Sequence, residues 1–272
     1  MLEYLGSGKN AKIYKAELDD GTIVAIKQNS FLYNNRRVEK FNSECSILKS
    51  LSHTNVVDYL FRQDHLLCTE IMDGDLSIEY YHPYFNSHAC ILDIARGVNY
   101  IHTIDTPIIH RDLKVENMLV IKEGGVVRQT KIGDFGYAVI ARPSINDQMP
   151  VFLDVDKTGT PLYMACEIVE PEEKEMITYS TASDMWAFGI ICWHLLTKGF
   201  IYPHITTIRG YRNYIVNGGR ANFQGTHGDK KLFEMIERCW NQDQFLRPTA
   251  LDFVKYFDGK INTIATETPQ LE

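Results

Sequence analysis

The feature that most constrains this chain is the run HRDLKVEN at residues 110–117, followed after a β-like stretch by DFG at residues 134–136. With an average usage of about 5% per residue type, seven specified positions recur by chance on the order of once in a billion placements. Asp112 can accept a proton from a hydroxyl nucleophile, and Lys114 can neutralise charge on a phosphoryl group in transfer. Asn117 and Asp134 offer oxygens suited to Mg²⁺. The pattern therefore predicts phosphoryl transfer that depends on positioned charges.

A glycine-containing stretch stands close to the start of the chain. The backbone N–H groups of Gly6 and Gly8 could approach phosphates, although this short pattern alone leaves a structural turn open. A dinucleotide-binding loop would need a helix directly after the glycines. Instead, β-rich residues 13–18 and 22–27 flank the turn signal Asp19-Asp20-Gly21, which predicts a hairpin.

Lys27 lies in the returning strand of that hairpin, and the period of two places Ala25 on the same face, beneath the glycine loop. Small Ala25 leaves room for a flat base while Lys27 reaches phosphate oxygens. A lone lysine in a strand is usually a solvated edge charge. Here, however, Phe41 and Leu48 mark the inward face of a predicted helix, and Glu44 falls on that face. Because a buried carboxylate needs a partner, we expect Glu44 to pair with Lys27.

Composition excludes several functions for the chain. Its 272 residues carry 28 basic and 35 acidic side chains, and the net charge of −7 argues against general binding to nucleic acid or to an anionic membrane. No apolar stretch approaches the roughly 20 residues that span a bilayer. The six cysteines show no metal-binding spacing and the first residues lack a secretory signal. We therefore expect a cytoplasmic protein with reduced thiols.

The chain changes character near residue 73. Strand-like runs and one helix make up the first part, and Asp73-Gly74-Asp75 then breaks the last strand. Beyond it, apolar stripes with helical spacing predict a mainly helical second part, including a buried helix over residues 185–196. The residues from Lys260 onward are typical of a loosely held polar tail.

The order of these motifs resembles the eukaryotic protein kinase family from about Leu5 to Phe257, and most closely its tyrosine-kinase-like serine/threonine branch. The resemblance implies an α+β, bilobal protein kinase fold. Its N-lobe (1–72) would be a small antiparallel β-sheet with one helix, and its C-lobe (73–258) larger and mainly helical. A C-terminal tail (259–272) would follow.

The resemblance also implies ATP and Mg²⁺ as cofactors and protein substrates as partners, with the oligomeric state left open. It assigns Asp112 and Lys114 to catalysis, and Asn117 and Asp134 to magnesium. The residues that it places around the nucleotide are Leu5, Gly6, Gly8, Ile13, Ala25, Lys27, Glu44, Thr69, Glu70, Met72 and Leu119.

Several further positions gain a role from the resemblance. Thr69 is the implied gatekeeper, and the backbone groups of Glu70 and Met72 face adenine. Glu167 is implied to pair with Arg247.

Asp184 resembles the helix-F aspartate of the family, and two other positions depart from the family pattern. Ala11 replaces the third glycine of the loop, which restricts its backbone mildly. Cys166 stands where the family has proline, which removes a fixed φ from that turn. We expect neither departure to abolish activity.

The implied function is transfer of the γ-phosphate of ATP to serine and threonine, because Lys114 and the run Gly159-Thr160-Pro161 look like serine/threonine enzymes. The pair Cys239-Trp240 looks more like the tyrosine-kinase branches. A dual-specificity kinase and a pseudokinase scaffold are the alternatives.

The long activation segment, residues 134–167, carries the candidate phosphorylation sites Tyr137, Ser144 and Thr158. Counting back four residues from Thr160 places Asp156 opposite Arg111. A carboxylate there would do part of the work of a phosphate and order the segment without modification. A solvated acidic loop is the alternative.

Overall fold

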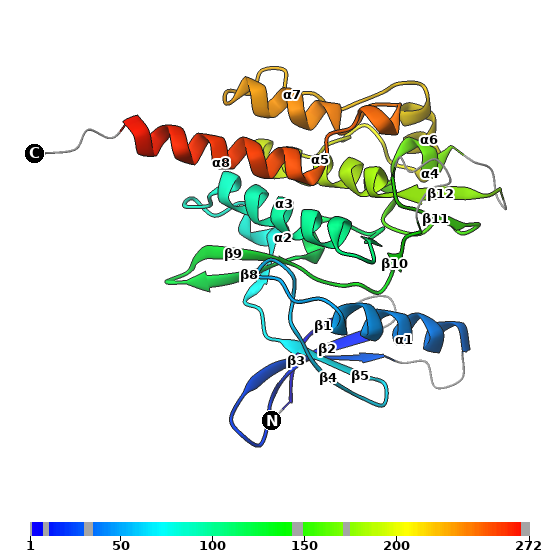
Figure 1. The fold of residues 1–272 in the computed structure, drawn as a ribbon, viewed down its shortest axis with the longest axis vertical. Coiled ribbons are helices and arrows are strands. Elements are labelled where there is room, and N and C mark those ends of the chain that lie inside the picture. Colours follow the sequence, from blue (N-terminus) through cyan, green and yellow to red (C-terminus); the bar gives the residue numbers. More distant parts are fainter. Residues whose placement is uncertain (1, 8–10, 30–34, 143–148, 171–174, 268–272) are drawn as a thin grey trace, which may run out of the picture.

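In the computed structural model, which describes residues 2–7, 11–29, 35–142, 149–170 and 175–267, the chain forms two lobes (Figure 1). The first lobe carries a five-stranded antiparallel sheet in the order β1-β2-β3-β5-β4, together with helix α1. Its elements are β1 (Leu2–Ser7), β2 (Ala11–Glu17), β3 (Ile23–Asn29), α1 (Asn35–Lys49), β4 (Tyr59–Gln63) and β5 (Leu66–Glu70). The predicted N-lobe architecture is confirmed.

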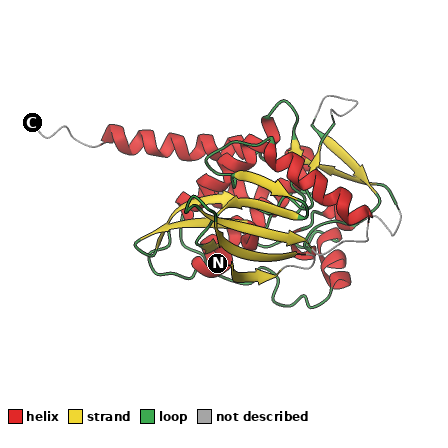
Figure 2. Cartoon of the chain, turned by 90° about the horizontal axis from the view of Figure 1, so that it is seen from below, coloured by secondary structure: helices red, strands yellow, loops and turns green. Residues whose placement is uncertain are grey.

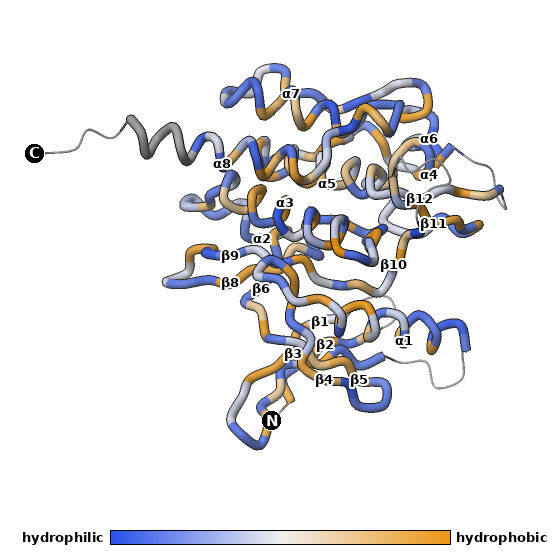
Figure 3. The backbone as a smooth tube through the Cα atoms, in the orientation of Figure 1, coloured by the Kyte–Doolittle hydropathy of each residue, from blue (hydrophilic) through white to orange (hydrophobic). Residues whose placement is uncertain are grey.

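Local sequence signals explain the two elements of this lobe that matter most for the site. Gly21 has φ +84°, a conformation that suits glycine, and it turns the chain so that β2 pairs with β3. In α1, Phe41, Cys45 and Leu48 are buried, as their spacing predicted, and Glu44 is buried beside them. The opposite, polar face of α1 remains in solvent, and Figure 3 shows its first turn as hydrophilic.

The second lobe is mainly helical, as predicted. Its helices are α2 (Leu76–Glu79), α3 (Ser87–Thr103), α4 (Cys166–Val169), α5 (Thr181–Thr197), α6 (Ile208–Val216), α7 (Lys230–Arg238) and α8 (Ala250–Glu267), with 3₁₀ turns η1 (Val115–Asn117), η2 (Pro161–Tyr163) and η3 (Gln244–Leu246). Helix α5 lies in the centre, between α3 and α7, and twelve of its residues are buried (Figure 1). It begins with a capping box between Ser180 and Ser183.

The remaining strands of the described residues form three small sheets. They join β6 (Gly74–Asp75) with β8 (Met118–Glu123) and β9 (Val126–Ile132), β7 (Ile108–Ile109) with β10 (Val139–Ile140), and β11 (Val151–Asp154) with β12 (Ile177–Ser180). The ribbon β8–β9 lies on the side of the second lobe that faces the first lobe (Figure 1). The pair β11–β12 ties the activation segment to the strand that leads into α5.

At the end of the chain, α8 continues through Glu267, past residue 260, where the sequence suggested that a polar tail begins. Its last turns extend beyond the other helices (Figure 2). Among the helices of the described residues, none combines the length and the apolar character that a membrane span requires.

Candidate active site

A three-membered charge cluster joins the two lobes. Lys27 of β3 donates to Glu44 of α1 at 2.5 Å and to Asp134 of the DFG run at 2.7 Å. A Cβ on Gly136 would lie 3.2 Å from Asp134 Oδ1 and 3.5 Å from Lys27 Nζ, so glycine keeps this cluster uncrowded. The predicted pairing of Lys27 with Glu44 is confirmed.

The cluster fixes the ionisation of its members. Burial opposes the charge on Lys27, but Glu44 and Asp134 together raise the pKa of Lys27 above its ordinary value. Burial by itself would raise the pKa of Asp134, but the adjacent Lys27 ammonium lowers this pKa to about 2. Both groups are therefore charged at neutral pH, as phosphate and metal binding require.

Asp112 is buried and lies at the centre of a hydrogen-bonded group. Its Oδ1 accepts from the Thr160 hydroxyl at 2.7 Å, and its Oδ2 lies 3.2 Å from the Lys114 ammonium. Lys114 also donates to Thr160 Oγ1 at 3.2 Å. The Asn117 amide donates to the Asp112 carbonyl at 2.8 Å and to its carboxylate at 3.3 Å. The two predicted catalytic residues thus lie together, and both contact the Thr160 hydroxyl.

Helix α5 holds the loop that carries Asp112 through hydrogen bonds to Asp184. Asp184 accepts the N–H groups of His110 at 2.8 Å and Arg111 at 2.9 Å, and His102 Nε2 lies 2.9 Å from the same carboxylate. Arg111 has φ +66°, which is strained for a side-chain-bearing residue. The two hydrogen bonds to Asp184 offset that strain and fix the direction of Asp112.

The activation segment is anchored to Arg111 through Asp154. Arg111 Nη1 donates to Asp154 Oδ2 at 2.9 Å and Nε to the Tyr137 carbonyl at 2.7 Å. The Arg111 guanidinium lies over two aromatic rings. Its Cζ is 5.1 Å from the centroid of the Phe152 ring and 5.0 Å from that of the Tyr179 ring. Burial opposes ionisation of Asp154, but backbone N–H donors and Arg111 lower the pKa of its carboxyl.

The predicted contact of Asp156 with Arg111 is therefore wrong. Asp156 instead pairs with Arg36 at the start of α1, where both side chains are largely exposed. The difference of two residues arises because β11 pairs with β12 as far as Asp154 and fixes that residue beside Arg111. Counting along the sequence could not include this pairing.

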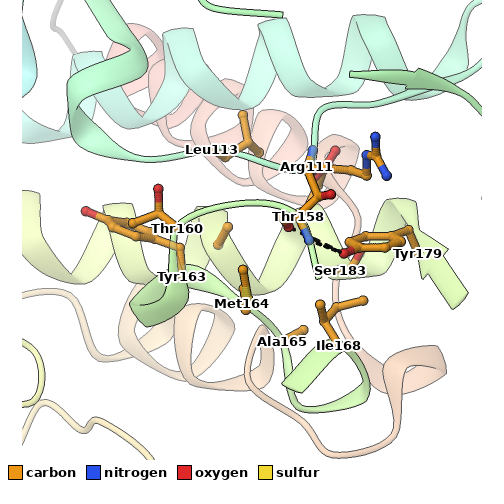
Figure 4. Close-up of a pocket in the computed structure, with 12 residues that line it drawn as sticks. Arg111, Leu113, Thr158, Thr160, Tyr163, Met164, Ala165, Ile168, Tyr179 and Ser183 are labelled. Atoms are coloured by element: carbon orange, nitrogen blue, oxygen red, sulfur yellow. Dashed lines mark hydrogen bonds between the residues drawn. The ribbon is translucent and has the colours of Figure 1, made fainter. Parts of the chain in front are cut away.

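Of the candidate phosphorylation sites, Thr158 is buried. Its N–H donates to the Tyr179 hydroxyl at 2.7 Å, as Figure 4 shows, and its side chain borders a cavity of about 20 Å³ between the activation segment and α5. A modifying enzyme could reach Thr158 only after the segment moves. Tyr137 is half-buried beneath the Lys40 ammonium, which lies 5.5 Å from its ring centroid. Ser144 lies outside the described residues.

The residues predicted to surround the nucleotide come from both lobes. From the first lobe come Leu5 and Gly6 on β1, Ile13 on β2, Ala25 on β3, and Thr69 and Glu70 at the end of β5. Ala25 and Thr69 are cross-strand partners. Met72 follows β5, and Leu119 lies on β8 in the second lobe. Leu5 is largely exposed, and Gly8 lies outside the described residues. Their contacts with a nucleotide stay predictions.

The predicted magnesium ligands fit an ion that arrives with phosphates. The Asn117 amide nitrogen donates to Asp112, so its Oδ1 is the atom suited to a metal ion, and the Asp134 side chain is 45% exposed. Within the described part of the chain, no group of three or more His, Cys, Asp or Glu side chains forms a metal site. Mg²⁺ commonly binds one or two protein oxygens and completes its shell with phosphates and water. This donor set suits such an ion.

Comparison with known proteins agrees with this geometry. A family model described as a protein kinase domain matches residues 1–257. The chain belongs to the protein kinase family. Two similar proteins are the dual specificity protein kinase shkE of Dictyostelium discoideum, 28% identical over 98% of this chain, and the serine/threonine-protein kinase VIK of Arabidopsis thaliana, 28% identical over 97%. A third, the Arabidopsis serine/threonine-protein kinase STY17, is 29% identical over 86%. The kinase chain spans 36%, 60% and 40% of their respective lengths.

Both departures from the family pattern are accommodated in this kinase. Ala11 is buried at the start of β2 and pairs with Asn29. Cys166 begins α4, and its thiol lies 3.3 Å from Glu167 Oε2. Glu167 forms two 2.7 Å bonds with Arg247, whose side chain is fully buried. The predicted ion pair is confirmed, and the loss of proline leaves it intact.

Sequence reasoning missed several residues that shape the site of the kinase. Asp154, His102 and Arg36 contact site residues that lie 43, 82 and 120 positions away along the chain. The helix-F resemblance of Asp184 was the one local signal that could have led to His102. For Asp154, the β-rich run 151–153 was the available signal, because it predicts a strand that must find a partner.

Proposed function

We propose that this kinase transfers the γ-phosphate of ATP to serine and threonine hydroxyls of protein substrates. The observation that carries the proposal is the hydrogen bond from the Thr160 hydroxyl to Asp112, with Lys114 beside both. An aliphatic hydroxyl already occupies the position from which Asp112 would accept a proton. A serine or threonine side chain entering the cleft would take a comparable position.

Each charged residue has a role in that reaction. Asp112 would orient the acceptor hydroxyl and accept its proton as the hydroxyl oxygen bonds to the γ-phosphorus, while the bond from that phosphorus to the β–γ bridging oxygen breaks and ADP leaves. Lys114 compensates the negative charge that develops on the transferred group. Lys27 would hold phosphate oxygens of ATP, and Glu44 keeps it directed into the cleft. Asn117 and Asp134 would hold Mg²⁺, which supplies charge neutralisation between the phosphates.

Phosphotransfer by purified protein tests the proposal. Wild type should label a mixed peptide library in the presence of MgATP, and Lys27→Met and Asp134→Asn should each abolish labelling. The two variants remove phosphate and metal contacts and leave the apolar core unchanged. Circular dichroism spectra that match wild type would serve as the folding control. Variants as active as wild type would sink the catalytic assignment, and an inactive wild type that binds ATP would favour the scaffold alternative.

The acceptor specificity is tested in the same library. Phosphoserine and phosphothreonine should dominate the products. Because the relative shkE is named a dual specificity kinase, phosphotyrosine as a substantial product would favour that second function.

We also propose a cytoplasmic location. All six cysteines are free and buried, which suits a reducing compartment. The net charge of −7 supports protein substrates over nucleic acid or membrane surfaces. Cell fractionation with an antibody against the chain checks the location.

A further inference from the structure

A second charge cluster centres on the buried ammonium of Lys131, with Glu70 22% exposed and Asp58 52% exposed. Lys131 of β9 has only 7% of its side chain exposed, and its ammonium donates to Glu70 Oε1 at 2.6 Å. Asp58 Oδ2 lies 3.5 Å from the same ammonium. These contacts involve none of the residues that pair with Lys27 at the predicted phosphate site.

The cluster connects three parts of the chain. Glu70 is the last residue of β5, and Asp58 immediately precedes β4. The two are joined further, because Glu70 Oε1 accepts the Asp58 N–H at 2.7 Å and the Glu70 N–H donates to the Asp58 carbonyl at 3.1 Å. Lys131 comes from the ribbon of the second lobe. The Lys131 ammonium therefore adds a side-chain ion pair to the backbone hydrogen bonds by which Ile132 joins Asn55 and Val57.

The position of Lys131 relates this cluster to adenine. Lys131 is the cross-strand partner of Leu119, and directly paired residues of an antiparallel ribbon project from the same face. Leu119 is the predicted floor of the adenine site, and Glu70 begins the hinge (residues 70–72) that is predicted to bond the base. The cluster thus fixes the hinge relative to that floor.

We infer that Lys131 is a positioning residue for adenine. It holds the carboxylate of Glu70 so that the hinge backbone stands at the distance from Leu119 that a flat base requires. A displaced hinge would weaken hydrogen bonds to adenine and leave the phosphate contacts unaffected, since Lys27 and Asp134 are held by their own ion pairs. The inference rests on the proposed ATP site.

The experiment compares Lys131→Met, Glu70→Gln and the double variant with wild type. The matched control is Lys122→Met in the same ribbon, which breaks a 2.8 Å ion pair with Glu79 of α2 and keeps the backbone bond of Lys122 to Asp73. The measurements are kcat, the KM for ATP, and calorimetric affinity for two probes. Adenosine tests the base site alone, and magnesium tripolyphosphate tests the phosphate site alone.

We expect Lys131→Met to raise the KM for ATP and the Kd for adenosine by about tenfold each, with kcat changed by less than about threefold. Tripolyphosphate affinity should remain at the wild-type value, and Lys122→Met should match wild type throughout. The double variant leaves no unpaired buried charge, so its melting temperature should recover relative to either single variant. Its adenosine Kd should stay raised, which a merely structural role would not produce.

The results also separate this inference from the proposed function. Wild type that neither binds nor uses ATP would refute the proposed function itself. Wild type that uses ATP, together with variants whose adenosine Kd lies within about twofold of it, would refute only the role of Lys131. Tighter adenosine binding in the variants would likewise overturn it, because the cluster would then be restraining the hinge. If Lys131→Met fails to fold, Glu70→Gln and the double variant decide the question.

Discussion

The bond between Arg111 and Asp154 predicts that this kinase is active without phosphorylation of its activation segment. Arg111 is 6% exposed and Asp154 is 23% exposed, so water screens the pair only partly. Asp154→Asn preserves the shape of the side chain and removes its charge. A hydrogen bond to a charged partner contributes about 1.5–3 kcal/mol, which corresponds to a shift of roughly 10- to 150-fold toward a displaced segment.

We expect kcat/KM to fall by about tenfold, near the lower end of that range, because the Tyr137 carbonyl and two aromatic rings still hold Arg111. The assay is peptide phosphorylation by phosphatase-treated enzyme. Asp156→Asn is the matched control, since Asp156 and its partner Arg36 are 45% and 69% exposed. An exposed pair contributes about 0–1 kcal/mol, so its loss should cost less than about fivefold.

Two results would refute this reasoning. The first is a wild-type enzyme that stays silent after phosphatase treatment and becomes active only when Thr158 is phosphorylated. The second is a larger loss for Asp156→Asn than for Asp154→Asn. The latter would mean that the segment in solution follows the spacing expected from sequence and not the β11–β12 pairing.

Three further outcomes follow from the structure. Glu167→Gln should leave Arg247 unpaired in the interior, at a cost of about 3–5 kcal/mol, and lower the melting temperature by roughly 6–20 °C in a thermal shift assay; an unchanged temperature contradicts the pairing. The pKa of Asp134 is lowered to about 2 in the folded state, below the ordinary 3.8, so its pairing with Lys27 stabilises the fold fully above about pH 4 and less as the pH falls toward about 2. In urea titrations, the difference in unfolding free energy between wild type and Asp134→Asn should therefore shrink as the pH falls. A difference that stays constant with pH would contradict the lowered pKa of Asp134. Thr69→Met should abolish binding of ATP-competitive inhibitors that place an aryl group behind adenine, and equal affinities in the two forms would show that Thr69 does not border that space.

Much of the N-lobe and of the charge cluster could be predicted from sequence, because their signals are local. Alternation around Asp19-Asp20-Gly21 gave the hairpin and set the face of Lys27. The spacing of Phe41 and Leu48 put Glu44 inward. A buried carboxylate needs a partner, and the local pattern placed the cationic Lys27 within its reach, so the pairing of Glu44 with Lys27 could be predicted.

The helical character of the C-lobe could be predicted from sequence, but the packing of its helices against one another could not. Apolar stripes predicted helices in this lobe, and the apolar run at residues 185–196 located α5, where most of those residues are buried as expected. A stripe tells which face is buried and not which helix covers it. The central place of α5, and with it the support of Arg111 by Asp184, depends on packing among segments far apart in the chain.

The sequence by itself determined the chemistry of this protein: a proton acceptor at Asp112, cationic side chains for phosphate and oxygens for magnesium, in an order that the kinase family shares. Only the tertiary structure decided which acidic residue meets Arg111, that Thr158 is buried, and that Lys131 reaches Glu70. Strand register places Asp154 beside Arg111, and the approach of the two lobes brings residues 70 and 131 within 2.6 Å. Periodicity and motif spacing act over a few residues, whereas these contacts are fixed by the free energy of packing the whole chain.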